Sequence, residues 1–176
     1  LLDAPGYADF VGEVKCAIRV VDSAIILLDA SAGVEVGTEY AARYANEQGV
    51  PIVLVVNKMD RENANFASSL ASAQAAFGQK VVPLYTPIGS ETTFRGVVDL
   101  LKMRSLFFSA NKDGTLTEED VPSDMLDEVE TYRLQLIEKI AENDEELMLR
   151  YLEDDEISAD ELRAGLRAGI AKGEVI

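Results

Sequence analysis

Two short, uninterrupted apolar runs constrain the fold of this chain more than any other feature of its sequence. They cover residues 24–28 and 51–56, and the second is rich in β-branched side chains. Strands that are apolar on both faces are typical of a parallel sheet covered by helices on each side. Residues 34–48 place apolar side chains at helical spacing, and residues 64–77 form an alanine-rich helical pattern. The alternation predicts a doubly wound α/β domain with right-handed crossovers.

The second half of the chain follows a different pattern. Residues 81–88 and 97–108 look extended and predict a pair of antiparallel strands. A long helix is expected next, with an apolar stripe formed by Met125, Val129, Tyr132, Leu136 and Ile140. Asn143 is expected to cap a short helix, and Ser158 begins a last helix through a capping box with Glu161. This half therefore predicts a small α+β unit.

Charge is distributed unevenly between the two halves. The net charge is −16; residues 1–80 contain 10 acidic and 6 basic side chains, whereas residues 81–176 contain 22 and 10. The shift favours two modules with a boundary near residues 78–80. Because a surface this acidic repels phosphate backbones, we expect no free-standing nucleic-acid binding. The charge favours a basic protein partner, or it serves solubility alone.

The residue content excludes several classes of site. The chain has no His and a single cysteine, Cys16. His/Cys zinc sites, Ser-His-Asp triads and Cys-His pairs are therefore excluded. A single cysteine forms no disulfide within the chain, which is typical of a reducing compartment, and we expect Cys16 to be packed in a helix. No apolar run approaches the length of a membrane span, so no membrane partner is expected.

A first polar cluster, Asp3-Ala4-Pro5-Gly6, follows two leucines that we interpret as the end of a strand. A carboxylate at a strand end can hold Mg²⁺ through a water molecule, since Mg²⁺ keeps most of its hydration shell. Gly6 has no Cβ atom, so its N–H group can approach a terminal phosphate closely. The same residues would also form an ordinary turn.

A second polar cluster, Asn57-Lys58-Met59-Asp60, follows the second apolar run directly. Ligands bind outside the carboxyl ends of parallel strands, so both clusters are expected at one edge of the sheet. The carboxylate of Asp60 can accept two parallel hydrogen bonds from the paired N–H groups of guanine, which adenine lacks. Asn57 would hydrogen-bond the ring edge, and the stem of Lys58 would cover the base or ribose. The alternative is a helix-initiating loop in which Asp60 is the cap.

The spacing of the two clusters resembles that of a known family. Asp3 and Asn57 are 54 positions apart, with a helix, a strand and a helix between them, as in the third and fourth guanine-nucleotide motifs of GTPases. Residues 3–10 resemble the magnesium and γ-phosphate motif and switch II of translational GTPases. The second half resembles the subdomain inserted in the GTP-binding domain of bacterial elongation factor G. The segments that carry this resemblance are residues 82–84, 87–89, 94–100, 102–103, 145–148, 150–152 and 161–162.

The resemblance implies a P-loop-GTPase-like parallel sheet core with an inserted α+β subdomain. Residues 1–78 would be the later part of the GTP-binding domain, and residues 79–176 would be the insert. No Gly-x-x-x-x-Gly-Lys-[Ser/Thr] sequence occurs, so the core is expected to be an incomplete fragment that lacks its N-terminal strands and P-loop. Without that loop, the fragment is expected to be inactive and to hold no cofactor of its own.

The resemblance also implies a function for the parent protein. Members of the family are cytoplasmic GTPases that couple GTP hydrolysis to translocation on the ribosome, and they use GTP, GDP and Mg²⁺. Residues 3–6 and 57–60 would bind the nucleotide, and Asp3 would hold Mg²⁺ through water. The insert would meet the ribosomal stalk protein through the acidic residues of its long helix, namely Asp124, Asp127, Glu128, Glu138 and Glu142.

One position departs from the family pattern. Elongation factor G usually has a His after the Asp-x-x-Gly motif, where it helps to orient the attacking water, and this chain has Tyr7 at that catalytic position. A phenol stays protonated near neutral pH and does not replace an imidazole there. Tyr7 favours a factor-G-like paralogue with altered or slow hydrolysis. It also keeps open an alternative, a GTPase-like ribosome-binding module with weak or no hydrolysis.

Residues 109–120 resemble a calcium loop. Asn111, Asp113 and Thr115 lie at matching places, but Ser109 occupies the first position, and Asp120 at the last is too short for the usual bidentate Glu. A hairpin turn at residues 112–114 accounts for the same residue pattern, because Asp-Gly is a preferred turn pair. We therefore expect a hairpin here.

Overall fold

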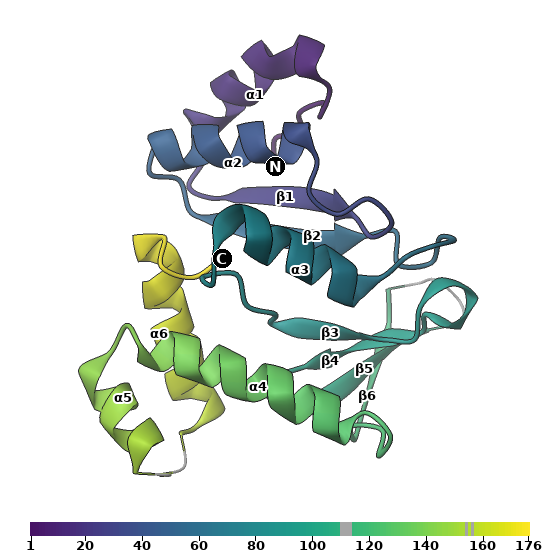
Figure 1. The fold of residues 1–176 in the computed structure, drawn as a ribbon, viewed down its shortest axis with the longest axis vertical. Coiled ribbons are helices and arrows are strands. Elements are labelled where there is room, and N and C mark those ends of the chain that lie inside the picture. The colour runs from purple at the N-terminus through teal and green to yellow at the C-terminus, as the bar shows by residue number, and fades with distance from the viewer. Residues whose placement is uncertain (110–113, 154, 156) are drawn as a thin grey trace.

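A computed structural model describes residues 1–109, 114–153, 155 and 157–176 of the chain. The described strands form a parallel pair, β1 (Ala24–Asp29) and β2 (Ile52–Asn57), and an antiparallel sheet in the order β3 (Tyr85–Ile88), β4 (Gly96–Asp99), β5 (Arg104–Phe108), β6 (Leu116–Glu119). The helices are η1 (Ala8–Phe10), α1 (Val11–Ile18), α2 (Val36–Glu47), α3 (Phe66–Phe77), η2 (Glu91–Thr93), α4 (Leu126–Ala141), α5 (Glu145–Leu152) and α6 (Ala159–Lys172). Figure 1 shows the parallel pair above the antiparallel sheet, with α3 between them.

The two apolar runs form the parallel pair that the sequence predicts. Residues 24–29 pair in register with residues 52–57, so that Asp29 lies beside Asn57. Each strand continues one residue beyond its apolar run and ends on a polar side chain. Parallel strands need a crossover connection, and α2 supplies it. The structure thus confirms the strand–helix–strand–helix order of the first half.

The described residues cover the parallel pair on only one face. Ile26 and Leu28 are on that face and are buried against α2 and α3. Ile25 and Leu27 are on the opposite face and are 62% and 59% exposed. The prediction of helices on both faces is therefore wrong for this chain. An apolar run indicates that both faces of a strand are apolar, but not that the same chain covers both.

The start of the chain also differs from the prediction. Residues 1–6 are irregular, so no strand precedes Asp3 in the part of the chain that the structure describes. A strand needs a neighbour for its backbone hydrogen bonds, and β1 pairs only with β2 among the described strands. In α1, which follows, Cys16 is exposed rather than packed as expected.

The second half contains a four-stranded antiparallel sheet instead of the predicted pair. The segment 97–108 is not one extended strand, because a turn after Asp99 separates β4 from β5. The carboxylate of Asp99 accepts hydrogen bonds from the N–H groups of Leu101 and Lys102, at 2.9 and 3.1 Å, and Met103 has a left-handed φ of 55°. Side-chain-to-backbone bonds of this kind favour turns, and the apolar residues around them concealed the break.

The apolar stripe predicted for α4 forms the core of the second half. Val129, Leu136 and Ile140 are buried in one cluster with residues of β4 and α6. Arg133 on the same helix donates hydrogen bonds to the carbonyl oxygens of Leu100 and Leu101, and burial lowers its pKa. The arginine thus fixes α4 to the turn that joins β4 and β5.

Short polar side chains begin the last two helices. Asp144, rather than the predicted Asn143, caps α5, and its carboxylate accepts hydrogen bonds from the N–H groups of Glu146 and Leu147 at 3.0 and 3.2 Å. A carboxylate is favoured there because it lies at the positive end of the helix dipole. The predicted capping box between Ser158 and Glu161 is confirmed at the start of α6. None of the described helices combines the length and apolarity that crossing a bilayer requires.

The Ser158→Ala variant is expected to raise the pKa of Glu161. The Ser158 hydroxyl and N–H donate to Oε2 of Glu161 at 2.6 and 2.9 Å, and Arg150 donates to Oε1; together they lower this pKa from 4.5 to about 2. Because the folded-state pKa is the lower one, the stabilisation is complete above about pH 4.5 and is lost as the pH falls towards 2. NMR titration should place the Glu161 midpoint higher in the variant, with melting a few degrees lower. An unchanged midpoint would contradict the capping box.

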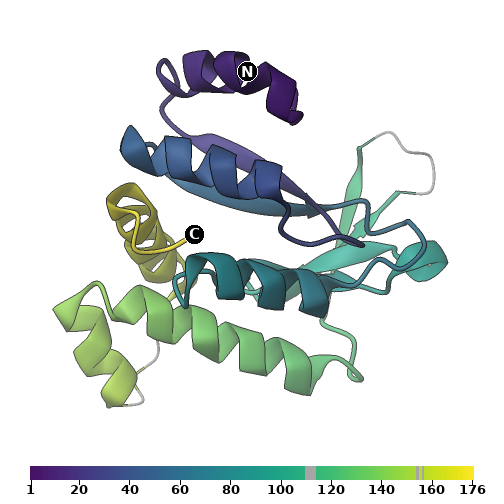
Figure 2. The ribbon, with the colours of Figure 1, turned by 45° about the horizontal axis from the view of Figure 1, so that its top comes forward.

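The two halves meet along α3 and α4. Both ribbon views place these helices side by side (Figure 1 and Figure 2), and the rings of Phe66 and Tyr132 meet edge to face with centroids 6.2 Å apart. The end of the chain also returns to the boundary region. The N–H of Ile176 donates to the carbonyl of Lys80 at 2.8 Å, and its carbonyl accepts from the N–H of Val82 at 3.2 Å. The second half is therefore fixed to the first half by side-chain packing and by backbone hydrogen bonds.

Strands lie on both sides of the segment that resembles a calcium loop. β5 and β6 pair antiparallel, with Phe108 opposite Leu116, whereas an EF-hand calcium loop joins two helices. Lys112 and Asp113 of the predicted turn, and Asn111 of the loop, lie outside the described residues. No group of three metal-ligating side chains occurs in the described part of the chain. The antiparallel pairing of β5 and β6 favours the hairpin.

Candidate functional site

The second polar cluster lies where the two parallel strands end. Asp29 is the last residue of β1, Asn57 is the last residue of β2, and the two are register partners. The backbone N–H of Ala30 donates to the carbonyl of Asn57 at 2.9 Å, so the strands stay paired up to the point at which both chains turn away. Residues 57–60 therefore begin at the carboxyl edge of the sheet, as the sequence predicts. The pairing of the two strand ends fixes the position of the first of these residues.

The loop after β2 is ordered by local hydrogen bonds. The side-chain oxygen of Asn57 accepts from the N–H of Lys58 at 2.8 Å, and the N–H of Arg61 donates to the carbonyl of Lys58 at 3.0 Å. Lys58 has a left-handed φ of 63°, a conformation that costs a non-glycine residue about 1–2 kcal/mol. Met59 is buried in a small cluster with Ala30. The loop is therefore a defined turn.

Asp60 is left open to solvent by this turn. Its side chain is exposed, and the described residues offer it no hydrogen bond or ion pair. The helix cap is instead Asn65, whose side chain accepts from the N–H of Ser68 at 2.9 Å. The alternative in which Asp60 caps the following helix is therefore wrong. A carboxylate that no protein group uses is available to accept hydrogen bonds from a ligand.

Asp29 belongs to this site, although the sequence analysis did not single it out. Its Oδ2 atom accepts from the Lys58 ammonium at 2.6 Å. Its Oδ1 atom accepts from the N–H and hydroxyl of Ser31, at 3.0 and 2.7 Å. The bond from Lys58, followed by those from Ser31, holds the pKa of Asp29 well below its usual range. Asp29 directly follows the apolar run 24–28, just as Asn57 follows the run 51–56. That position could have identified Asp29 as a candidate site residue.

Glu91 of η2 ties the loop to the second half. Its backbone N–H donates to the carbonyl of Met59 at 2.8 Å, and its carboxylate accepts from the N–H of Asn63 at 2.7 Å. Glu91 and Asn63 both have left-handed φ values, 52° and 64°. Two hydrogen bonds from a residue distant in the sequence therefore hold the backbone on both sides of Asp60.

A Glu91→Ala variant is expected to loosen this loop. The change removes the acceptor of the Asn63 N–H, so that amide should exchange with solvent at least about tenfold faster, and the chain should lose about 1 kcal/mol of stability. Hydrogen exchange by NMR measures the first effect, and urea unfolding measures the second. Glu62→Ala, an exposed neighbour, is the control and should change neither. Unchanged exchange at Asn63 would show that the carboxylate does not hold the loop.

The first polar cluster lies near the start of α2. A Cβ atom added at Gly37 would lie 3.0 Å from the carbonyl oxygen of Gly6, so this segment passes the end of α2 that follows β1. Asp3 is exposed, and a Cβ atom added at Gly6 would meet nothing within 4 Å. A hydrated Mg²⁺ needs few protein ligands. The exposed carboxylate and the open space at Gly6 therefore fit a hydrated cation and a phosphate.

The two clusters are separate in the described residues. No hydrogen bond joins residues 3–6 to residues 57–60, and Ala4, Pro5 and Met59 bring no polar side chain. Tyr7 is 78% exposed, so its phenol is free of packing constraints at the position where the family pattern has His. The structure thus orders the second polar cluster closely and leaves the first polar cluster on an exposed, irregular segment.

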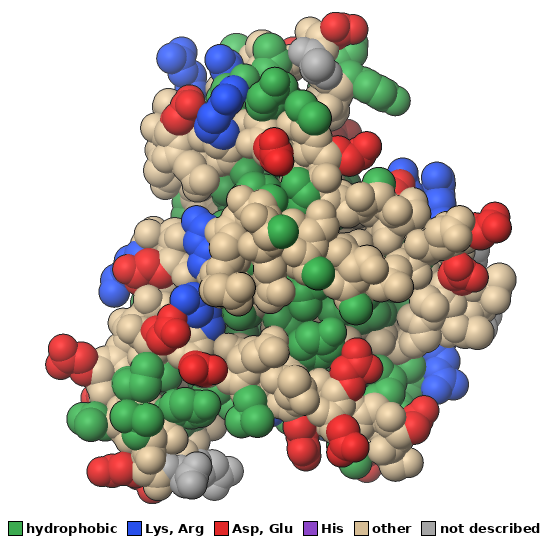
Figure 3. Space-filling model, in the orientation of Figure 1, with side chains coloured by type: hydrophobic (Ala, Val, Ile, Leu, Met, Phe, Trp, Pro, Cys, Tyr) green, Lys and Arg blue, Asp and Glu red, His purple; other side chains and the backbone are tan. Residues whose placement is uncertain are grey.

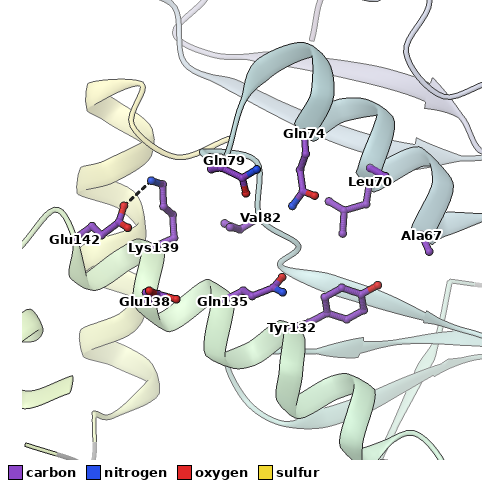
Figure 4. A pocket seen from close by; sticks show the side chains of 11 residues that line it. Ala67, Leu70, Gln74, Gln79, Val82, Tyr132, Gln135, Glu138, Lys139 and Glu142 are labelled. Atoms are coloured by element: carbon purple, nitrogen blue, oxygen red, sulfur yellow. Dashed lines mark hydrogen bonds and ion pairs between the residues drawn. The ribbon is translucent and has the colours of Figure 1, made fainter. Parts of the chain in front are cut away.

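A cleft of about 480 Å³ lies elsewhere, between α3 and α4 (Figure 4). Figure 4 shows Gln74 of α3 facing Gln135 of α4 across it. Lys139 in its lining is paired with Glu142 at 2.5 Å, and Gln74 donates to the carbonyl of Val81 at 3.1 Å. The sides of α3 and α4 and the segment that follows α3 line this cleft, and no residue of either polar cluster reaches it. The strand ends, not this cleft, are therefore the candidate site.

Comparisons with known proteins agree with this geometry. The sequence pattern of the family described as the elongation factor Tu GTP binding domain matches residues 1–158. A crystal structure of a protein from Thermus thermophilus has a TM-score of 0.88 and 31% sequence identity to this chain. That match covers 99% of this chain and 26% of the Thermus chain, so this chain spans about a quarter of that relative.

Proposed function

Because this chain belongs to the family of elongation factor Tu GTP binding domains, we propose that residues 57–60 bind the guanine base of GTP and GDP. Guanine presents two neighbouring N–H donors, and a carboxylate accepts both. Asp60 supplies that carboxylate, the carboxamide of Asn57 lies at the base edge, and the Lys58 stem covers one face of the ring. The chain is a translational GTPase domain, and these are the residues through which it recognises its nucleotide.

The observation that supports this proposal most strongly is the free carboxylate of Asp60. The turn around it is held by Asn57, by the Lys58–Asp29 ion pair and by Glu91, yet Asp60 itself takes part in none of these bonds. A loop fixed on both sides of an unused acceptor is suited to recognising a ligand with paired donors, because ordering is complete before binding. An ordinary connecting loop has no need of that arrangement.

The phosphate end of the nucleotide is assigned to residues 3–6. Asp3 would hold Mg²⁺ through water, and the N–H of Gly6 would approach the terminal phosphate. Bound Mg²⁺ supplies charge neutralisation of the phosphates. We divide the chain accordingly into a nucleotide-binding part, residues 1–78, and an inserted subdomain, residues 79–176.

In the whole protein we propose a factor-G-like role, in which GTP hydrolysis is coupled to translocation on the ribosome. The family places the chain in translation, and the acidic second half is suited to a basic ribosomal partner. Figure 3 shows acidic side chains along the lower edge of the molecule, over α4. Five exposed acidic residues belong to α4 or flank it: Asp124, Asp127, Glu128, Glu138 and Glu142. We propose that this surface meets the stalk protein.

An NMR titration of the ¹⁵N-labelled chain with GDP and with ADP tests the base site. GDP is expected to shift the amides of residues 57–60 with a dissociation constant weaker than micromolar, since no P-loop sequence contributes. ADP should bind at least about tenfold more weakly, because it lacks the paired donors. Equal shifts with both nucleotides, or none at residues 57–60, would sink the proposal.

Tyr7 supports a second candidate, a ribosome-binding module that hydrolyses GTP weakly or not at all. Its exposed phenol lies at the position where the family pattern has an imidazole. Phosphate release by the whole protein, measured with and without ribosomes, separates the two functions. Turnover comparable with that of a translocase would eliminate the second candidate, and ribosome binding without turnover would favour it.

A further inference from the structure

The ammonium of Lys58, a residue of the proposed base site, is held by Asp29 from the neighbouring strand end. Its stem has four rotatable bonds, and a free lysine stem on a surface samples many rotamers. Here the ammonium lies 2.6 Å from Oδ2 of Asp29, and the two side chains are 39% and 21% exposed. The stem is therefore held along the carboxyl edge of the sheet instead of extending into solvent.

The carboxylate of Asp29 is itself fixed in orientation. Ser31 donates two hydrogen bonds to Oδ1, and the backbone N–H groups of Ala32 and Gly33 donate to the carbonyl of Asp29 at 3.0 and 2.9 Å. These bonds form a tight turn at the end of β1. Oδ2 is thus the one carboxylate oxygen that is left for Lys58, and its direction is set by the turn.

The backbone of Lys58 needs such support. Its left-handed φ of 63° is disfavoured for a residue with a Cβ atom, and it persists only where the surroundings impose it. The Asn57 side chain fixes one side of this residue, and the ion pair to Asp29 fixes its far end. Asp60 lies two residues further on, so its direction depends on the same turn.

From these contacts we infer that Asp29 is a positioning residue of the proposed guanine site, which holds the Lys58 ammonium so that the Lys58 stem and Asp60 are ordered before the nucleotide binds. This inference rests on the proposed function. Asp29 does not touch the base; it acts through Lys58. Because the ammonium is engaged by Asp29, Lys58 contributes its aliphatic stem to the ligand and not its charge.

The Asp29→Asn variant separates positioning from folding. The asparagine oxygen can still accept the two hydrogen bonds from Ser31, but the charge that holds Lys58 is gone. GDP titration followed by NMR should show binding about three- to tenfold weaker than in the unchanged chain, with a well-dispersed spectrum in both. Asp22→Asn is the matched control, since this exposed residue precedes the opposite end of β1, and it should leave the affinity unchanged.

Measuring the effect of Asp29→Asn with and without a second substitution at Lys58 distinguishes the positioning role from a purely structural role. Lys58→Met keeps an unbranched stem and removes the ammonium, so Asp29 loses its partner. Asp29→Asn should then weaken GDP binding in the unchanged background but have no further effect beside Lys58→Met. A structural role through Ser31 would instead weaken binding equally in both backgrounds.

The outcomes distinguish this inference from the proposed function. If GDP shifts residues 57–60 in the unchanged chain with preference over ADP, but Asp29→Asn binds GDP equally well, the positioning role is overturned and the base site stands. If the unchanged chain shows no guanine preference, the base site itself fails and the role of Asp29 fails with it. Additive effects of the two substitutions would also overturn the positioning role.

Discussion

A Gly96→Ala variant is expected to lose about 3 kcal/mol of folding stability, the upper end of what overpacking costs. Gly96 lies in β4, between β3 and β5. A Cβ atom there would lie 2.4 Å from the carbonyl oxygen of Leu106 and 3.0 Å from the Cα of Phe107. Both are backbone atoms of the neighbouring strand, so no side chain can move aside to relieve the contact. The two central strands would have to separate.

Thermal unfolding measures this loss directly. For a chain of this size, it corresponds to a fall in melting temperature of about 6–12 °C. Gly12→Ala is the matched control, because a Cβ atom at Gly12 would meet nothing within 4 Å and alanine favours the helix α1. That variant should be stabilised by about 0.5–1 kcal/mol. If the Gly96→Ala variant melts at the same temperature as the unchanged chain, the strands can separate at this point without loss of stability.

Local patterns were sufficient to predict the elements of the fold whose cause is local. The apolar runs at residues 24–28 and 51–56 give β1 and β2 because short apolar runs with β-branched side chains favour strands over helices. The capping box of Ser158 and Glu161 gives the start of α6 because both partners lie within one turn. The apolar stripe of α4 gives its buried face for the same reason. In each case, residues within a few positions of one another determine the outcome.

The features that the sequence did not reveal depend on distant residues. Asp29 and Lys58 are 29 positions apart, and Glu91 and Asn63 are 28 positions apart, so no local pattern connects them. Ile25 and Leu27 are exposed because α2 and α3 pack on the other face of the strand pair. The residue types within a strand do not show which face the helices will cover. The division of residues 97–108 into two strands depends on the Asp99 side chain, a polar signal within an apolar stretch. The polar cluster at residues 57–60 was predictable, but the contacts that hold it were not.

Asp60→Asn is expected to change the base preference of the site from guanine to xanthine. Guanine carries N1–H and an exocyclic amine, both donors, which a carboxylate accepts. Xanthine has a carbonyl oxygen in place of that amine, so it presents one donor and one acceptor. An asparagine at this position accepts from N1–H and donates to the carbonyl, whereas its amide would face the guanine amine with two donors opposed.

The same titration measures the effect with GDP and xanthosine diphosphate. Binding of GDP to the Asp60→Asn variant should weaken at least about tenfold, since a hydrogen bond to a charged group contributes about 1.5–3 kcal/mol, and binding of xanthosine diphosphate should strengthen by a similar factor. Asp22→Asn, the same substitution away from the site, should change neither. Loss of GDP binding without a gain for the xanthine nucleotide would mean that Asp60 supports the loop but does not read the base. If the affinity rises for the xanthine nucleotide alone, Asp60 is the group that pairs with the base. The substitution of this one side chain then changes which donors and acceptors the site can match.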